Sequence, residues 1–194
     1  QVVDITMEGM IGGPEEDEEE PEEGDTDSDQ NQTASSDYPD AYRPIEEGGY
    51  FYSQNVLPSG GCLLACMAMV SSNIHQKLIT PEDVYAHNGY GVYLASWTDM
   101  HEKLELKRAQ TINFLEVPES QRLDYVAALL EVYPEGVILG FQKSGKWHYL
   151  VVMGYDEKTE TLYVNDPVGG HNVPLEETWT GYSMFSSQKE AIQY

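Results

Sequence analysis

The chain has 194 residues, with 34 Asp and Glu against 10 Lys and Arg, which gives a formal net charge of −24 at pH 7. This excess of negative charge disfavours binding to nucleic acid and to anionic membrane surfaces, because both attract Lys and Arg. No apolar run approaches the roughly 20 residues that a membrane-spanning helix needs, so no membrane insertion is expected. The length favours one domain with additional segments rather than two domains.

Negative charge is concentrated at the N-terminus. Residues 1–48 carry 17 Asp and Glu against the single base Arg43, whereas residues 49–194 carry 17 acids against 9 bases. Such an acidic stretch with few apolar residues cannot bury enough surface to offset the entropy of ordering it. The sequence therefore predicts a disordered acidic arm over residues 1–48, acting as a linker, and a folded domain over residues 49–194.

The sequence GCLLACMAMVSSNIH, which follows the start of the folded domain, is apolar on nearly every helical face. This pattern is typical of a helix buried inside a domain, and Cys62 would stand in its first turn. Cys62 and Cys66 would share one face of this helix, where their side chains are poorly placed for a disulfide. We therefore predict two free thiols.

Three further helices are expected in the first two-thirds of the domain. Each begins with a Ser or Thr that can cap a helix, and Pro or acidic residues occupy the first turn of the first two. These helices are predicted from Thr80 to about His87, from Ser96 to about Lys107, and from Ser120 until Pro134 and Gly136 end the third.

The hydrophobic period changes after Gly136. The runs VILGF, WHYLVVMGY and TLYVND are rich in β-branched and aromatic residues, and the turn-like segments KSGK and DEKTE separate them. These runs predict an antiparallel meander. A helical half followed by a sheet half predicts an α+β fold, in which the buried cysteine helix packs against the sheet and a cleft lies between the halves.

Cys62 is the candidate nucleophile. A thiol reacts as its thiolate, and the N-terminus of a helix favours the anion. Cys66 lies one turn deeper and is expected to be a small buried apolar residue. A cysteine before an apolar helix is more often part of the packing than catalytic, so a partner histidine decides between these interpretations.

His148 opens the second predicted strand, and Asp166 closes the third. Antiparallel strands joined by a short turn bring the start of one beside the end of the next, so the two side chains should lie close together. The acid of a Cys-His-Asp set holds the imidazole in its working tautomer and orientation. Asn165 is the weaker candidate for this role, since strand alternation points it to the opposite face; a plain turn at Asn-Asp-Pro is the alternative interpretation.

These residues resemble a known family. Gln54, Cys62 at the head of an Ala- and Met-rich helix, HYLVVMGYD and YVNDP are similar to the cysteine peptidases that process double-glycine bacteriocin leaders. They are most similar to the broad bacterial group that shares this peptidase domain without the transporter. The resemblance implies a papain-like fold in which Cys62 is the nucleophile, His148 the base, Asp166 the orienting acid and Gln54 the side-chain donor of an oxyanion hole.

The residues beside the cysteine depart from the leader-processing members of that family. Those members place an acidic residue before the cysteine and a glycine after it, whereas Gly61 and Leu63 stand there in this chain. The departure bears on the leader-peptide substrate more than on the chemistry.

The function predicted from these features is that of a thiol peptidase or amidase, an enzyme that hydrolyses a peptide or amide bond through an acyl-enzyme on Cys62. Two alternatives remain: a papain-like acyltransferase, in which an amine replaces water, and a catalytically silent binding module on the same fold. The expected partner is a peptide or protein substrate, and no cofactor or metal is expected. A secreted or cell-surface location in a bacterium is the leading expectation.

The acidic arm contains a segment similar to a double-glycine leader. Val2, Met7 and Met10 stand twelve, seven and four places before the end of the pair Gly12-Gly13. This spacing predicts a possible self-interaction, in which the arm occupies the cleft of its own domain. Pro14 opposes the idea, because a rigid ring without an N–H would follow the cut.

Overall fold

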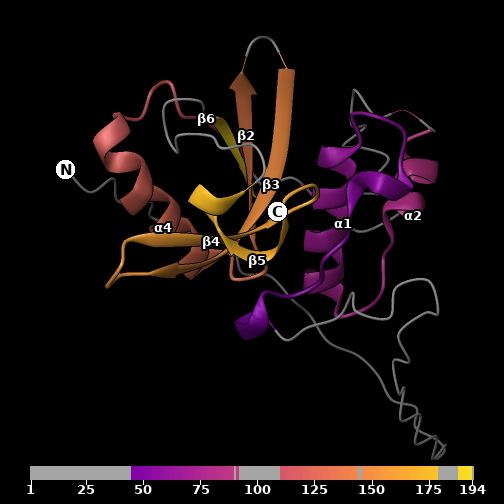
Figure 1. The fold of residues 1–194 in the computed structure, drawn as a ribbon, viewed down its shortest axis with the longest axis horizontal. Coiled ribbons are helices and arrows are strands. Elements are labelled where there is room, and N and C mark those ends of the chain that lie inside the picture. Colours follow the sequence, from indigo (N-terminus) through magenta and orange to yellow (C-terminus); the bar gives the residue numbers. More distant parts are fainter. Residues whose placement is uncertain (1–44, 90, 92–109, 144–145, 179–187, 194) are drawn as a thin grey trace, which may run out of the picture. The chain divides into compact units, whose positions relative to one another are not determined.

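The computed structural model describes residues 45–89, 91, 110–143, 146–178 and 188–193 (Figure 1). All of them lie in one compact unit, residues 32–194. Two expectations fall outside these ranges and stay predictions: the disorder and self-interaction of the arm up to residue 44, and the helix from Ser96 to about Lys107. The last four residues of the predicted arm are described. They contain the 3₁₀ turn η1 (Ile45–Glu47) and the buried Gly48, and Ile45 packs against the core.

Helix α1 (Cys62–His75) is the buried helix that the sequence predicts, and it begins at Cys62. Its residues from Leu64 to Asn73 are all buried, which agrees with a sequence that is apolar on nearly every face. It ends at Gln76, whose left-handed backbone (φ 49°) turns the chain and whose N–H donates to the Ser72 carbonyl. No helix in the described ranges has the length and apolar character needed to cross a membrane.

Helix α2 (Pro81–His87) begins as predicted. The Thr80 hydroxyl accepts a hydrogen bond from the Asp83 N–H at 3.2 Å, and the Asp83 carboxylate accepts one from the Thr80 N–H at 2.9 Å. This reciprocal capping box stabilises the first turn.

The prediction that Ser120 caps the helix before Pro134 is wrong. Ser120 lies inside the 3₁₀ turn η3 (Glu119–Gln121), and α4 (Arg122–Val132) follows directly without a side-chain cap. The 3₁₀ turn that follows Pro118 occupies the place where an α-helical first turn was expected. Helix α4 ends with Tyr133 as its C-cap, immediately before Pro134, because proline disfavours a helical conformation in the residue that precedes it.

The sheet has six strands in the order β1-β6-β2-β3-β4-β5, and every neighbouring pair is antiparallel. The predicted meander is present as β2, β3 and β4. Strands β1, β5 and β6 were not predicted, because they are short and lack apolar alternation. The strands are β1 (Gln110–Asn113), β2 (Val137–Lys143), β3 (Lys146–Asp156), β4 (Thr161–Asp166), β5 (Gly170–Pro174) and β6 (Gln188–Gln193).

The sheet separates two hydrophobic cores, because neighbouring residues of a strand point to opposite faces. Val151 of β3 packs in the core with α1 and α2, whereas Val152 packs in the core with α4. Figure 1 accordingly shows α1 and α2 on one side of the sheet and α4 on the other. The prediction of an α+β fold with the cysteine helix packed against the sheet is confirmed.

Candidate active site

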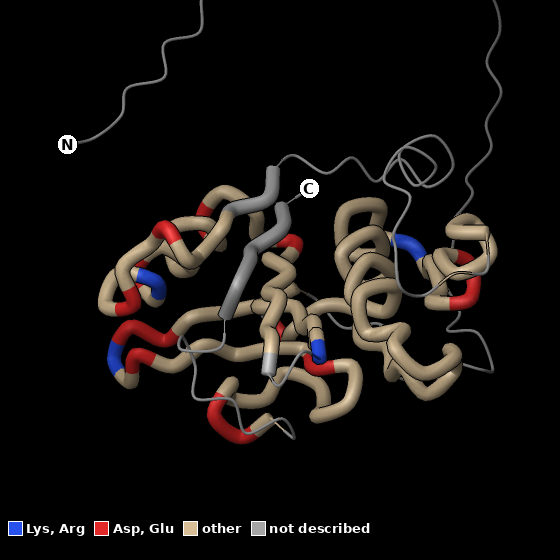
Figure 2. Tube along the Cα trace, turned by 90° about the horizontal axis from the view of Figure 1, so that it is seen from above, with Lys and Arg blue, Asp and Glu red and all other residues tan. Residues whose placement is uncertain are grey.

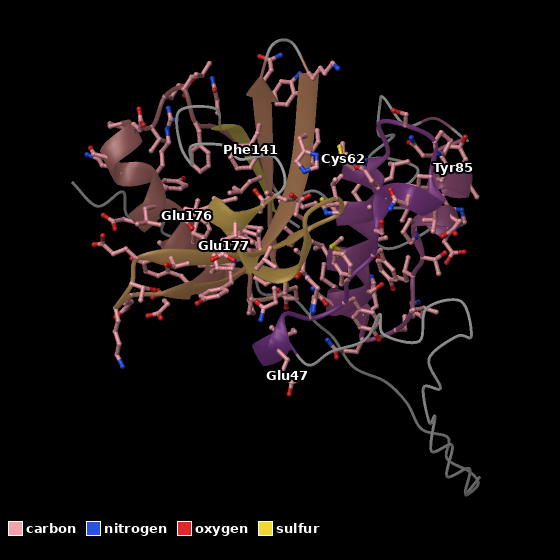
Figure 3. All side chains as sticks on the ribbon, viewed as in Figure 1. Glu47, Cys62, Tyr85, Phe141, Glu176 and Glu177 are labelled. Carbon is pink, nitrogen blue, oxygen red and sulfur yellow. The ribbon has the colours of Figure 1, made fainter. Side chains whose placement is uncertain are left out.

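The N-terminus of α1 presents the thiol of Cys62 towards β3 (Figure 3). The N-cap residue is Gly61, which has no side chain to bond the first N–H groups of the helix, and the first intrahelical bond runs from the Ala65 N–H to the Gly61 carbonyl at 3.0 Å. The helix therefore offers uncapped N–H groups and the positive end of its dipole beside a thiol. Cys62 is a free cysteine with 6 % of its surface exposed.

Gly61 is required by close packing. A Cβ atom at this position would come within 2.7 Å of the Leu57 Cβ and 2.8 Å of its Cδ1. Gly60, one residue earlier, has φ +97°, a conformation that residues with side chains rarely adopt. The two glycines thus bring the chain tightly into the first turn of α1. This packing accounts for the glycine, rather than an acidic residue, before Cys62.

His148 and Asp166 meet across neighbouring strands. His148 lies near the start of β3 and Asp166 at the end of β4, and the His148 Nε2 atom is 2.8 Å from the Asp166 Oδ1 atom. Both residues are buried, with 8 % and 0 % of their surfaces exposed. The same Oδ1 accepts the Val168 N–H at 3.0 Å, which holds the carboxylate at the start of the turn after β4.

The thiol of Cys62 interacts with the His148 side chain, and its hydrogen bond and charge raise the pKa of the imidazole. Because Asp166 occupies Nε2, the ring nitrogen left for the thiol is Nδ1. A second, long contact joins the Cys62 Sγ to the Gly60 carbonyl oxygen at 4.0 Å. The order Asp166, His148, Cys62 is therefore a continuous line of contacts from a buried carboxylate to a thiol.

The electrostatics of this line favour a charged imidazole. Burial lowers the pKa of His148, but the hydrogen bonds and negative charges of Asp166 and Cys62 outweigh it and raise the pKa from 6.5 to about 9. Burial raises the pKa of Asp166, but the hydrogen bond and charge of His148 reverse this and hold the pKa below its usual value. The two directions agree, since each partner stabilises the charged form of the other.

Cys66 has none of these surroundings. It is fully buried within α1, and burial raises the pKa of its thiol well above the ordinary value; the charges of Cys62 and Asp166 raise it further. Its burial agrees with the prediction of a small apolar residue. Both cysteines are free, so the prediction of two thiols is confirmed.

Gln54 lies in the 3₁₀ turn η2 (Gln54–Val56) and is tied to the strand that carries the acid. Its backbone N–H donates to the Pro167 carbonyl at 3.1 Å, one residue beyond Asp166. The Oε1 atom of its side chain is buried and has no hydrogen-bond partner among the described residues. The chain thus holds one end of the Gln54 amide, unbonded, in a buried position.

Two buried asparagines, Asn165 and Asn73, fix the segment that leads to Gln54, and this role was not predicted for either of them. Asn165 donates from Nδ2 to the carbonyls of Gly48 at 2.7 Å and Tyr50 at 3.1 Å, while its Oδ1 accepts the Asn172 N–H at 2.9 Å. From the other side, the Tyr50 N–H donates to the Asn73 Oδ1 at 2.8 Å. Residues 48–54 therefore form a strap, clamped between β4 and the last turn of α1.

The strap explains why Asn165 does not orient the histidine. All of its polar atoms are used in bonds to residues 48, 50 and 172, on the opposite side of β4 from Asp166. A buried asparagine at the end of an apolar helix, as in VSSNIH, was the one signal in the sequence that could have pointed to Asn73, because a buried amide needs partners.

Among the described residues, no group of three or more His, Cys, Asp or Glu side chains is arranged to hold a metal ion. The line of contacts at Cys62 has a different composition: one thiol, one imidazole and one carboxylate. Such a set can generate a thiolate and move a proton.

Comparison with known proteins agrees with this geometry. Residues 50–190 match the model of the Peptidase_C39 like family. The match covers the strap from residue 50, helix α1 and the strands that carry His148 and Asp166. No curated protein matches the chain. The fold is the α+β papain-like arrangement that the resemblance implied, and the chain belongs to the Peptidase_C39 like family.

Proposed function

We propose that the protein is a thiol peptidase or amidase that hydrolyses its substrate through an acyl-enzyme on Cys62. Its family indicates cysteine peptidase activity in general terms. The observation that carries the specific proposal is the line of contacts from Asp166 through His148 to Cys62, with Nε2 of the histidine 2.8 Å from the carboxylate.

The first step forms the nucleophile. The Cys62 thiol gives its proton to Nδ1 of His148, which leaves a thiolate beside an imidazolium. Asp166 stabilises the imidazolium, and the uncapped N-terminus of α1 stabilises the thiolate. The carboxylate stays ionised throughout, because its pKa lies below the usual value.

The second step transfers the acyl group. The thiolate attacks the carbonyl carbon of the scissile bond, and the carbonyl oxygen becomes an oxyanion. The Cys62 N–H and the amide of Gln54 are the donors proposed to receive it. A half-turn of the Gln54 side chain puts its NH₂ group where the unbonded buried Oε1 now lies, and the oxyanion would then satisfy that group. One such donor typically contributes about 3 kcal/mol to transition-state stabilisation.

The remaining steps release the products. The imidazolium of His148 gives its proton to the leaving amine as the carbon–nitrogen bond breaks, and a thioester forms on Cys62. His148, now neutral, removes a proton from water, whose oxygen attacks the thioester carbonyl. The acid product leaves, and the proton returns to the thiolate–imidazole pair, so the enzyme is unchanged.

A mass-spectrometric experiment tests this proposal directly. The full chain is treated with N-acetylglycine p-nitrophenyl ester, an activated acyl donor, and the intact mass and peptide map are recorded. We expect a burst of p-nitrophenol and one acetylglycyl group on Cys62. Cys66→Ala should give the same burst, and Cys62→Ala should give none. Acylation of Cys66 in place of Cys62 would show that the assignment of Cys62 as the nucleophile is wrong. No acylation at all would favour the silent binding module.

A second arm separates hydrolysis from acyl transfer. The acylated protein is incubated in buffer with and without added glycine amide, and the released products are identified. Free acetylglycine as the main product supports the hydrolase. Acetylglycyl-glycine amide as the main product at low concentrations of the amine would make the protein an acyltransferase, with the same residues in the same roles.

A further inference from the structure

An open cavity of about 540 Å³ lies away from the candidate active site, at the other end of β3. None of Cys62, His148, Asp166 and Gln54 lines it. One wall follows η1, and Figure 3 shows Glu47 of this turn far from Cys62 in the molecule. Its volume is within the usual range of small-ligand sites, roughly 300 to 1,000 Å³.

The walls of the cavity combine apolar surface with a few polar groups. Two tyrosine rings and one carboxylate stand among aliphatic side chains, and none of the lining residues that the structure describes is Lys, Arg or His. The lining residues are Ile45, Gly48, Leu130, Pro134, Met153, Gly154, Tyr155, Asp156, Tyr163 and Asn172.

The charge around this cavity is negative. The last residue of β3 and the turn that follows it carry three acids, Asp156, Glu157 and Glu160, against the single base Lys158. Figure 2 shows this hairpin end as red segments around one blue segment. Loss of solvent raises the pKa of Tyr155, and the charges of these three acids and Asp124 raise it further. An anionic ligand would therefore be repelled from this wall.

The side chain of Lys or Arg combines the properties that such a cavity selects. Its aliphatic stem can pack on Met153 and Leu130 while its charged head stays at the polar rim. The charged head can lie over the ring face of Tyr163 and form an ion pair with the carboxylate of Asp156. The acidic arm of this chain has the opposite charge, with a single Arg43 among 17 acids, and is a poor occupant.

The strap connects this cavity to the candidate active site. Gly48 lines the cavity, whereas Gln54 is tied to the residue after Asp166, so six residues of the chain cover the separation. Six extended residues span at most about 20 Å. An extended peptide bound at both places would therefore need at most about six residues between them.

We propose that this cavity is an exosite for a Lys or Arg side chain of the peptide substrate, up to about six residues from the scissile bond. The inference rests on the proposed peptidase function for its choice of occupant. The cavity itself and its charge are independent of that function, so binding and turnover can be tested separately.

Binding is tested on the full chain carrying Cys62→Ala, which cannot turn over a substrate. The methionine methyl groups are labelled with ¹³C, and the Met153 signal is assigned with Met153→Leu. The protein is then titrated with Nα-acetyl-lysine methylamide and, separately, with Nα-acetyl-norleucine methylamide, which has a similar stem and no charge. We expect a saturable shift of the Met153 methyl signal with the lysine probe only, while the signals of the core residues Met67 and Met69 stay in place.

Two matched variants locate the charge that is recognised. In the wild type the Asp156 Oδ1 atom accepts a hydrogen bond from the Lys158 N–H at 2.9 Å. Asp156→Asn keeps an oxygen that can accept this bond but removes the negative charge from the cavity. We expect the lysine probe to bind roughly tenfold more weakly to this variant. Glu176→Gln removes an exposed charge outside the cavity and should leave binding unchanged.

Turnover then tests the choice of occupant. A quenched fluorescent peptide that the wild-type chain cleaves is made with Lys or norleucine about six residues from the cut, on either side. We expect KM to be roughly tenfold lower for one of the Lys peptides, and Asp156→Asn to abolish the difference without changing kcat. Equal shifts of Met153 with both probes, or no shift with either, would overturn the exosite while leaving the peptidase proposal intact. If the lysine probe bound to the cavity but the protein hydrolysed no peptide, the proposal that the bound Lys or Arg belongs to a substrate would be refuted.

Discussion

The first and second turns of α1 place the same chemical group in opposite surroundings. Cys62 keeps 6 % of its surface exposed, bonds to His148 and lies at an uncapped helix N-terminus. Cys66 stands only about 6 Å further along the helix axis, and it is fully buried. The difference shows that the position of a thiol relative to the helix end and the sheet, rather than its presence on the helix, decides what it can do.

The two thiols are also coupled. The negative charges of Cys62 and Asp166 both add to the burial that raises the pKa of Cys66. The charges that favour an imidazolium at His148 therefore oppose a second thiolate one turn deeper.

The largest expected effect comes from removing the thiol of the proposed nucleophile, Cys62. Cys62→Ala should lower turnover by a factor of at least about 10⁴, because the nucleophile of a covalent mechanism has no substitute. The midpoint of thermal unfolding should change little, since one sulfur at a helix start contributes little packing. Hydrolysis rates and thermal unfolding curves of the purified variant check both points.

The next largest effect comes from the acid. Asp166→Asn keeps the shape of the side chain but loses the charge, and kcat/KM should fall on the order of 10²- to 10⁴-fold. In the wild type, the alkaline limb of kcat/KM should lie near pH 9, where His148 loses the proton that the leaving amine needs. In the variant this limb should move to lower pH, because the hydrogen bond and charge of Asp166 raise the pKa of His148.

The response of the two cysteines to iodoacetamide provides the control for this variant. Labelling of Cys62 near pH 6 should slow when Asp166 loses its charge, whereas Cys66 should stay unlabelled in both folded proteins. A variant with unchanged labelling and an unchanged alkaline limb would show that Asp166 only supports the fold.

A smaller effect is expected from the strap. Asn165→Asp keeps the oxygen that accepts the Asn172 N–H but replaces the donor that faces the carbonyls of Gly48 and Tyr50. The strap should shift, and a displacement of Gln54 on the order of 1 Å can lower kcat by up to about 100-fold. Labelling of Cys62 near pH 6 should be unchanged, because the contact of Cys62 with His148 does not involve the strap. This result would separate stabilisation of the oxyanion from activation of the thiol.

Asn113→Ala, on the exposed β1 edge, is the control for a general effect of losing an asparagine. Both variants are compared at a temperature where circular dichroism shows them fully folded. If Asn165→Asp slowed labelling and turnover by the same factor, the strap would act on the thiol rather than on Gln54.

The predictable parts of this fold have local signals. The start of α1 follows from glycines before an apolar run, and β3 and β4 follow from runs of β-branched and aromatic residues. The proximity of His148 and Asp166 then follows from antiparallel geometry alone, and the two lie 2.8 Å apart. Each of these inferences used residues close together in the sequence or joined by one short turn.

The parts that could not be predicted depend on distant partners. Strands β1 and β6 have polar sequences and form through pairing with each other and with β2. Asn165 bonds to carbonyls 117 and 115 residues away, so in the sequence Asn-Asp-Pro it resembles a turn residue. Ser120 illustrates the opposite error, in which a local signal was present but misleading. It was predicted to cap a helix, but it lies in a 3₁₀ turn, and the α-helix begins two residues later.

The smallest expected effect belongs to the buried thiol. Cys66→Ala should leave kcat/KM unchanged and lower the free energy of unfolding by about 1–2 kcal/mol at pH 7, since it removes one buried atom from the core. The pH dependence of this stability difference tests whether Cys66 is sheltered from solvent. In the unfolded chain a cysteine ionises around pH 8.5, whereas burial keeps Cys66 protonated to higher pH in the folded protein. Its contribution to stability is therefore complete below about pH 8.5 and is lost as the pH rises through the raised pKa. The difference in unfolding free energy between wild type and Cys66→Ala, measured by urea denaturation from pH 7 to 10, should narrow above about pH 8.5. Because both proteins retain His148 and Asp166, their titration cancels in the difference. A gap that stays constant across this range would mean that Cys66 ionises equally in both states and is not sheltered from solvent.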